Sequence, residues 1–237
     1  MSRSNNKTEE NNTYRFERKF IIPFYYQEFI YEIIANLPSR FIEIFNERDI
    51  NNIYMDTLNY DIFKENIDGL SNRNKLRMRW YGEKYGNIKG NIEIKSKKGY
   101  VGKKTSYEIE NFNFNANSDF RDINSQILKN HIPHSLKEYF MKCSPTLFNR
   151  YSRRYFLSID KKIRITVDFR IKNYKISNSP RDHIFFPYSF PHMILEVKYS
   201  SALNIGNNII SSYLPFRVSK YSKYINGIFH LEGITFN

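Results

Sequence analysis

The chain has 237 residues, a mass of 28.6 kDa and a formal net charge of +13, since 37 Lys and Arg outnumber 24 Asp and Glu. Hydrophobic residues make up 41%, with 19 Tyr and 20 Phe, which is enough to bury a core, and no stretch approaches the roughly 20 apolar residues of a membrane helix. The only cysteine, Cys143, excludes an internal disulfide or a Cys-based zinc cluster and fits a reducing compartment, so we expect a soluble, cytoplasmic protein. Its positive electrostatic potential should attract anions.

The sequence pattern predicts an α+β fold built mainly from antiparallel strands. Residues 1–13 are polar and lack an apolar segment, which predicts a disordered tail and leaves residues 14–237 as a single domain. Strands are expected at 14–22, 41–45, 52–55, 75–81, 91–97, 105–109, 147–158, 162–171 and 193–199, with hairpin turns at Gly82, Gly86 and Gly90. Helices are expected at 23–36, ended by Pro38, and at 119–130, 135–142, 202–213 and 220–229.

At least five of these strands carry one charged face, because residues two apart project to the same side of a strand. The charged faces are Arg15, Glu17 and Lys19; Lys75, Arg77 and Arg79; Glu93, Lys95 and Lys97; Arg164, Thr166, Asp168 and Arg170; and Glu196 and Lys198. For any one strand, a solvated sheet face is the ordinary interpretation. Here basic residues dominate, and two cations about 6 Å apart at an effective dielectric near 20 repel each other by about 3 kcal/mol. Converging faces therefore need bound anions or interleaved carboxylates.

We expect the sheet to form a closed or nearly closed antiparallel barrel of about eight strands, in which these charged faces meet inside. Arg binds phosphate oxygens in pairs and Lys supplies point charges, so such an interior suits a chain of phosphates. The Glu residues would then hold a divalent cation that bridges phosphate oxygens.

The same segments carry a resemblance to a known family. They are Arg-Phe-Glu-Arg-Lys at 15–19, Ile-Tyr-Met-Asp-Thr at 53–57, Lys-Leu-Arg-Met-Arg-Trp-Tyr-Gly at 75–82, Ile-Glu-Ile-Lys-Ser-Lys at 92–97, Tyr-Ser-Arg-Arg-Tyr at 151–155, Arg-Ile-Thr-Val-Asp at 164–168, Leu-Glu-Val-Lys at 195–198 and Ser-Lys-Tyr at 219–221. In their order and spacing the sequence resembles the VTC domain, the polyphosphate polymerase module of the vacuolar transporter chaperone, within the triphosphate tunnel metalloenzyme (CYTH-like) superfamily.

The resemblance implies a basic triphosphate tunnel with flanking helices and a set of site residues. The implied phosphate ligands are Lys19, Arg77, Arg79, Lys95, Arg153, Arg164, Lys198 and Lys220. Glu196 is the implied principal ligand of Mn²⁺ or Mg²⁺, with Glu17 and Glu93 as further contributors, and Arg77, Arg79, Arg164 and Glu196 are the implied catalytic residues. Arg150, Arg153 and Arg154 compete for one position, and the alternation with Tyr151 and Tyr155 favours Arg153.

Three functions stay open at this point. The first is transfer of the terminal phosphate of ATP to a polyphosphate chain held in the tunnel, and the second is hydrolysis of a triphosphate in the same site. The third is non-catalytic binding of polyphosphate or nucleic acid, but the aromatic residues mostly alternate with charges as core-facing partners, so no stable nucleic-acid complex is expected. The segment at 99–105 lacks the spacing of a P-loop and is interpreted as a basic loop in which Lys103 or Lys104 can reach phosphate.

Overall fold

The computed structural model describes residues 15–99, 101–176, 187–200 and 212–233. Its strands are β1 Arg15–Pro23, β2 Phe41–Asp56, β3 Asn72–Tyr81, β4 Gly86–Lys98, β5 Val101–Phe114, β6 Ser144–Ser158, β7 Ile163–Lys175, β8 Tyr188–Ser189 and β9 His192–Ser200. Its helices are the 3-10 turn η1 Phe24–Tyr26 and the α-helices α1 Gln27–Asn36, α2 Asp61–Ile67, α3 Phe120–Lys129, α4 His134–Met141 and α6 Lys223–Glu232. The α+β class and the antiparallel sheet are confirmed.

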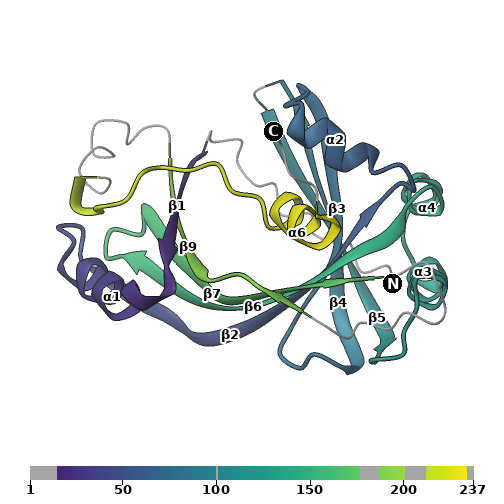
Figure 1. The fold of residues 1–237 in the computed structure, drawn as a ribbon, viewed down its shortest axis with the longest axis horizontal. Coiled ribbons are helices and arrows are strands. Elements are labelled where there is room, and N and C mark those ends of the chain that lie inside the picture. The colour runs from purple at the N-terminus through teal and green to yellow at the C-terminus, as the bar shows by residue number, and fades with distance from the viewer. Residues whose placement is uncertain (1–14, 100, 177–186, 201–211, 234–237) are drawn as a thin grey trace, which may run out of the picture.

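The strands form one nine-stranded sheet in the order β1-β9-β7-β6-β2-β3-β4-β5, with β8 paired to β7. The sheet is strongly curved but not closed into the expected ring, because among the described strands β1 pairs only with β9 and β5 only with β4. The other edge of β1 makes an isolated bridge between Phe20 and Val218. Figure 1 shows β1 and β9 at one end and β3, β4 and β5 at the other, with β2, β6 and β7 running between them. Side chains connect the two ends, since Lys95 Nζ of β4 lies 4.0 Å from Glu17 Oε2 of β1.

Strand β2 corrects the prediction of separate strands at 41–45 and 52–55. It is continuous along β6, with register irregularities between Glu43 and Phe45, between Phe45 and Arg48, and between Tyr54 and Met55. Each bulge adds a residue to one strand and breaks the strict alternation that sequence reasoning depends on. Only residues from Ile50 onward also pair with β3, so the first half of β2 is an edge on that side.

The structure corrects the predicted place of Gly90 and adds a helix that the sequence did not predict. Gly90 lies inside β4 at a bulge instead of in a turn, and a Cβ there would stand 2.7 Å from the carbonyl oxygen of Arg79, so the close approach of β3 requires glycine. The short helix α2 was not predicted. Its first turn is held by the buried Asp56 carboxylate, which accepts hydrogen bonds from the backbone N–H groups of Ile62 and Phe63, both at 2.9 Å.

The apolar residues opposite the charged faces pack against helices on the convex side. One cluster joins β3, β4 and β5 to α3 and α4, around Trp80, Ile92, Phe112 and Ile127. A second joins the other end of the sheet to α1, around Ile30, Ile34, Val167 and Leu195. Because both helical layers cover the convex side, the charged side of the sheet is left to face inward.

Helix α6 lies on the concave side, against β6 and β7 (Figure 1). Its N-cap is Ser222, whose hydroxyl accepts from the N–H of Ile225, so the helix expected at 220–229 begins at Lys223. Gly227 lets the helix approach the sheet closely, because a Cβ there would stand 2.6 Å from Leu147 Cδ2 and 3.0 Å from Asn173 Oδ1. The predicted tail at 1–13 and nearly all of the helix expected at 202–213 lie outside the described residues.

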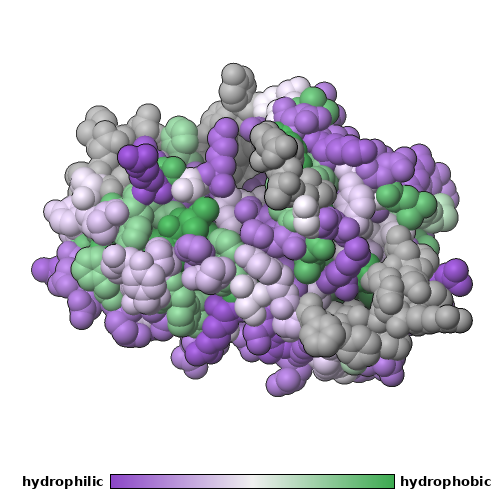
Figure 2. Space-filling model, viewed as in Figure 1, coloured by the Kyte–Doolittle hydropathy of each residue, from purple (hydrophilic) through white to green (hydrophobic). Residues whose placement is uncertain are grey.

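The molecular surface is mainly hydrophilic in the view of Figure 2, with hydrophobic residues gathered at the left over the region of β1 and α1. The exposed aromatic residues there include Phe16, Phe24 and Phe29. In the part of the chain that the structure describes, no helix has the length and apolar character needed to cross a bilayer.

Candidate functional site

The strand register brings the charged faces of the sequence onto one side of the sheet, because residues directly paired across antiparallel strands project to the same face. The relevant pairs are Lys19 with Glu196, Glu17 with Lys198, Arg164 with Lys198, Thr166 with Glu196, Arg153 with Asp168, Lys75 with Lys95, Arg77 with Glu93, and Lys95 with Lys104. We call this surface, together with Arg79 of β3 and Lys223 of α6, the charged concave face. Its carboxylates are interleaved among the cations, and within it they form three groups.

The first group surrounds Glu196, which is 7% exposed. Lys198 Nζ lies 2.5 Å from Glu196 Oε1, Lys19 Nζ lies 3.6 Å from Oε2, and Glu17 lies 2.8 Å from Lys19 and 3.8 Å from Lys198. Burial alone would raise the pKa of Glu196, but the charges of Lys198 and Lys19 outweigh it and hold that pKa well below its usual range. Lys198 is in close contact with Oε1, whereas the ion-pair partner on Oε2, Lys19, is 3.6 Å away. Glu196 is therefore an ionised carboxylate.

The second group surrounds Glu93 on β4. Arg77 Nη2 and Nε lie 2.5 and 2.8 Å from Glu93 Oε2, Lys104 Nζ lies 2.7 Å from Oε1, and Arg79 Nη1 lies 3.8 Å from Oε2. Burial opposes ionisation, but these cations lower the pKa of Glu93 to about 2. Arg79 also donates to Asn52 Oδ1 at 2.8 Å, so its guanidinium is held from two sides.

The third group surrounds Asp168, which is 1% exposed on β7. Arg153 binds both carboxylate oxygens, and Lys223 of α6 binds Oδ2. The Tyr151 ring lies beneath both cations, 4.4 Å from Lys223 Nζ and 5.4 Å from Arg153 Cζ. Burial would raise the pKa of Asp168, but Arg153 and Lys223 together hold it below its usual range. The group fixes α6 to the floor of the concave face.

The remaining predicted residues lie at the margin of this arrangement. Arg164 and Lys220 are exposed and make no ion pair with any described residue, and the Lys95 side chain is 66% exposed. Among the three arginines that competed for one position, Arg153 alone lies on the charged concave face. Arg150 pairs with Asp49 at 2.7 Å, and Arg154 pairs with Glu43 at 2.6 Å on the convex side.

The comparisons with known proteins agree with this geometry. The model of the VTC domain family matches residues 14–231, nearly the whole chain. The chain belongs to the VTC domain family. A Vibrio parahaemolyticus protein whose proposed assignment is adenylate cyclase shares 13% identity and a TM-score of 0.50, over 91% of this chain and 99% of that one. A Pyrococcus horikoshii protein gives the same identity and TM-score over 93% of this chain and 100% of its own. These structures show a shared fold, and no curated protein matches the sequence.

Three residues of this VTC domain's charged face, Lys75, Asp168 and Lys223, were not among the predicted site residues, although strand alternation already placed Lys75 and Asp168 on the correct side. Lys104 was expected in a basic loop, but it lies on β5. Lys223 comes from α6, so no strand pattern could have included it. Lys75 donates to Ser222 Oγ at 3.0 Å, and burial together with Lys19, Lys95, Arg73 and Arg77 lowers its pKa to about 7.

The donor set fits a divalent cation that is shared with a bound ligand. Within the described residues no three acidic, His or Cys side chains converge as a complete metal site. Mg²⁺, however, is commonly held by one or two carboxylates together with substrate phosphates. Glu196 and Glu17 both lie within 4 Å of Lys198 and Lys19, so they form such a pair. Glu93 belongs to a different group and is engaged by Arg77 and Lys104.

Proposed function

We propose that this VTC domain is a metal-dependent polyphosphate polymerase that transfers the terminal phosphate of ATP to a polyphosphate chain. The observation that carries the proposal is the charged concave face, where cations from strands β1, β3, β4, β5, β6, β7 and β9 outnumber the four carboxylates Glu17, Glu93, Asp168 and Glu196. An extended polyanion is the ligand whose charge is distributed in the same way, along a line rather than at a point. Membership of the VTC family supports the same assignment.

In the proposed reaction an oxygen of the chain's terminal phosphate attacks the γ-phosphorus of ATP. A new phosphoanhydride bond forms, the bond between the γ-phosphorus and the β,γ-bridging oxygen breaks, and ADP leaves with that oxygen. The attacking group is already an oxyanion, so no strong general base is required. Catalysis then depends on positioning and on neutralising charge at the equatorial and leaving oxygens.

The arginines suit the positioning role because their own orientation is fixed before a ligand binds. Glu93 holds Arg77 through two hydrogen bonds, and Asp168 holds Arg153 through two more. Preorganised guanidinium groups lose little conformational freedom when phosphate oxygens arrive. Lys19 and Lys198 supply charge beside them, and Arg164 stands at the margin with its donors unpaired among the described residues.

Glu196 and Glu17 would hold Mn²⁺ or Mg²⁺, which, when bound, polarises phosphate oxygens and offsets charge on the leaving group. The protein's own contribution is these two carboxylates, of which Glu196 is kept ionised by Lys198 and Lys19. Glu196 is the more deeply buried of the two, and the ion-pair partner on its Oε2, Lys19, is 3.6 Å away.

The test is an assay of purified protein with ATP and either Mn²⁺ or Mg²⁺, followed by gel analysis for polymer and by measurement of free phosphate. The proposal expects polymer and ADP in matching amounts. Release of phosphate without polymer would mean that water is the acceptor and that the protein is a triphosphatase. Absence of both products would leave a binding protein and refute the catalytic proposal.

A further inference from the structure

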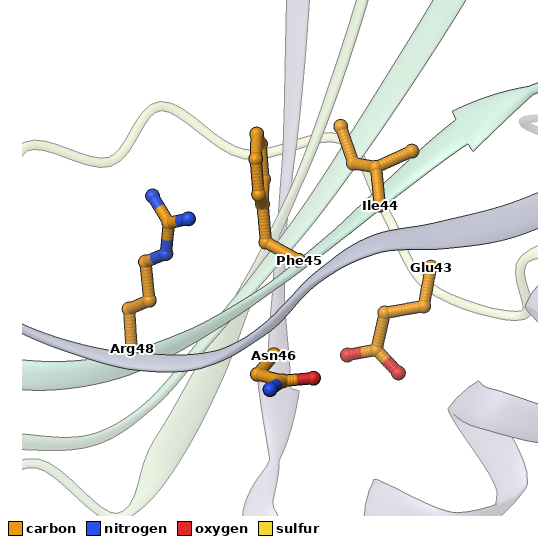
Figure 3. Close-up of a pocket in the computed structure, with 5 residues that line it drawn as sticks. All are labelled: Glu43, Ile44, Phe45, Asn46 and Arg48. Carbon is orange, nitrogen blue, oxygen red and sulfur yellow. The ribbon is translucent and has the colours of Figure 1, made fainter.

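The first half of β2 carries an aromatic and arginine cluster that the phosphate-binding residues do not include. Figure 3 shows Phe45, Ile44 and Arg48 projecting to one side of the strand, and Glu43 and Asn46 to the other. The five residues line a shallow depression of about 590 Å³ that is open to solvent. The two register irregularities at this point in β2 set the directions of these side chains.

Phe45 offers an aromatic surface beside the charged concave face. Its ring is 44% exposed and packs edge-on against Tyr155, with centroids 5.5 Å apart. The register pairs Phe45 with Tyr155 and Tyr155 with Thr166, and Thr166 pairs with Glu196. Phe45 is thus three strand spacings, about 14 Å, from the carboxylate expected to hold the metal. A nucleotide whose triphosphate lies at Glu196 extends over a comparable length.

Arg48 links this aromatic surface to the cations. Its guanidinium lies 4.1 Å from the centroid of Phe45 and 5.9 Å from that of Tyr155. Its cross-strand partner is Arg153, whose guanidinium stands 5.7 Å from the same Tyr155 ring. Among the described residues Arg48 has no ion pair and no hydrogen bond, so its N–H donors and one face of its planar group are available to a ligand.

We propose that Phe45, Arg48 and Tyr155 form a stacking site for the base of the nucleoside triphosphate that donates phosphate at the charged concave face. The proposal rests on the proposed function, since it assigns the nucleoside end of that substrate. Stacking on an aromatic ring or an arginine plane accepts any base, because every base has a π-face. The site therefore favours nucleoside triphosphates over inorganic polyphosphate as the first ligand, without selecting adenine by hydrogen bonds.

The experiment compares ATP with inorganic tripolyphosphate, which has the phosphates but no base. Affinities of both are measured by titration calorimetry for the wild type, Phe45→Ala, Phe45→Trp and the control Phe29→Ala. Phe29 is also 44% exposed but lies on α1 at the convex side. Because both phenylalanines are surface residues, both alanine variants should fold, and their melting curves check this.

Phe45→Ala is expected to weaken ATP binding about tenfold, within the range for loss of one stacked base, and to leave tripolyphosphate binding unchanged. Phe45→Trp should retain ATP affinity, and Phe29→Ala should change neither. The inference is overturned if Phe45→Ala binds ATP as well as the wild type, or if it weakens both ligands equally. If the wild type does not bind tripolyphosphate, the proposed function is refuted. A loss of ATP affinity in Phe45→Ala would still support the base-stacking site in that case.

Discussion

Replacing Asp168 by Asn tests how the charged concave face is held together without a ligand. The substitution keeps the shape of the side chain and removes one charge from a site that is 1% exposed. Arg153 and Lys223 then stay buried without the carboxylate that neutralises both. Breaking a buried ion pair by removing one partner costs about 3–5 kcal/mol. The upper part of this range is expected, because Asp168 neutralises two cations.

For a chain of this size 1 kcal/mol shifts the melting temperature by about 2–4 °C, so Asp168→Asn should lower it by about 6–20 °C. Differential scanning calorimetry across a pH series measures the shift. The pKa of Asp168 is lowered in the folded state, so its contribution is fully present above the usual carboxyl range, about pH 4–5, and is lost as pH falls through the folded pKa. The difference between variant and wild type should therefore shrink in acid.

The control is Glu110→Gln, which removes a carboxylate that is 61% exposed and 3.7 Å from Lys89. An exposed pair of this kind contributes about 0–1 kcal/mol, so its melting temperature should change little. If Asp168→Asn melts within the range of this control at neutral pH, the buried ion-pair group does not stabilise the fold, and the reasoning is wrong.

Four further outcomes are expected. Glu196→Gln should abolish turnover with ATP and Mn²⁺ while tripolyphosphate still binds. Near-normal turnover would show that Glu196 is not the essential metal ligand, and Glu17 would be tested next. Gly227→Ala should lower stability by about 1–3 kcal/mol in denaturant unfolding, because its methyl group would stand 2.6 Å from Leu147 Cδ2; an unchanged midpoint would show that α6 shifts freely. Tripolyphosphate at a hundredfold excess over Kd should stabilise the protein by about 2.7 kcal/mol in thermal unfolding, and an equal effect of sulfate at the same ionic strength would indicate generic anion binding. The pKa of Lys75 is lowered to about 7, so binding of tripolyphosphate near pH 8 should be accompanied by uptake of a proton by Lys75, and the affinity should fall as pH rises to 9. Calorimetry in buffers of different ionisation enthalpy measures the number of protons taken up. Binding without proton uptake would contradict this expectation.

Strict alternation along the strands explains why so much of the charged concave face could be predicted. The rule that separates Arg77 and Arg79 from Leu76 and Met78 also holds for β1, β9 and the first part of β7, so the cross-strand neighbours follow once the strands pair. It fails at Arg170, where a register irregularity and a positive φ direct the side chain to Glu47. The same alternation favoured Arg153 over Arg154, and the structure places these two on opposite faces.

The parts that could not be predicted are those where alternation fails or where a contact comes from outside the sheet. In β2, bulges interrupt the pattern around Phe45, so the segment looked like two strands, and the Phe45 and Arg48 cluster stayed hidden. Lys223 of α6 lies more than 50 residues after Asp168 in the sequence, yet the two side chains are in contact. Strand alternation identifies residues that share a face of the sheet and cannot predict a contact with a helix so far along the chain. The predicted barrel is an open, curved sheet in the described residues, and closure depends on accumulated twist rather than on any single residue.

The carboxylates on the charged concave face neutralise its lysines and arginines in the absence of a ligand. An anion that binds there must therefore compensate both the cations and the carboxylates that it displaces. A small anion that displaces Glu196 from Lys198 gains one contact but leaves a buried carboxylate with only the more distant Lys19, at 3.6 Å. A polyphosphate that arrives with divalent cations brings both signs at once, phosphate oxygens for the amines and guanidinium groups, and metal for the released carboxylates. Binding then becomes an exchange of partners in which no buried charge is stranded. Under the proposed function, we therefore expect the face to discriminate among anions by how many charges they deliver together, so that anions of low charge compete poorly even at high concentration.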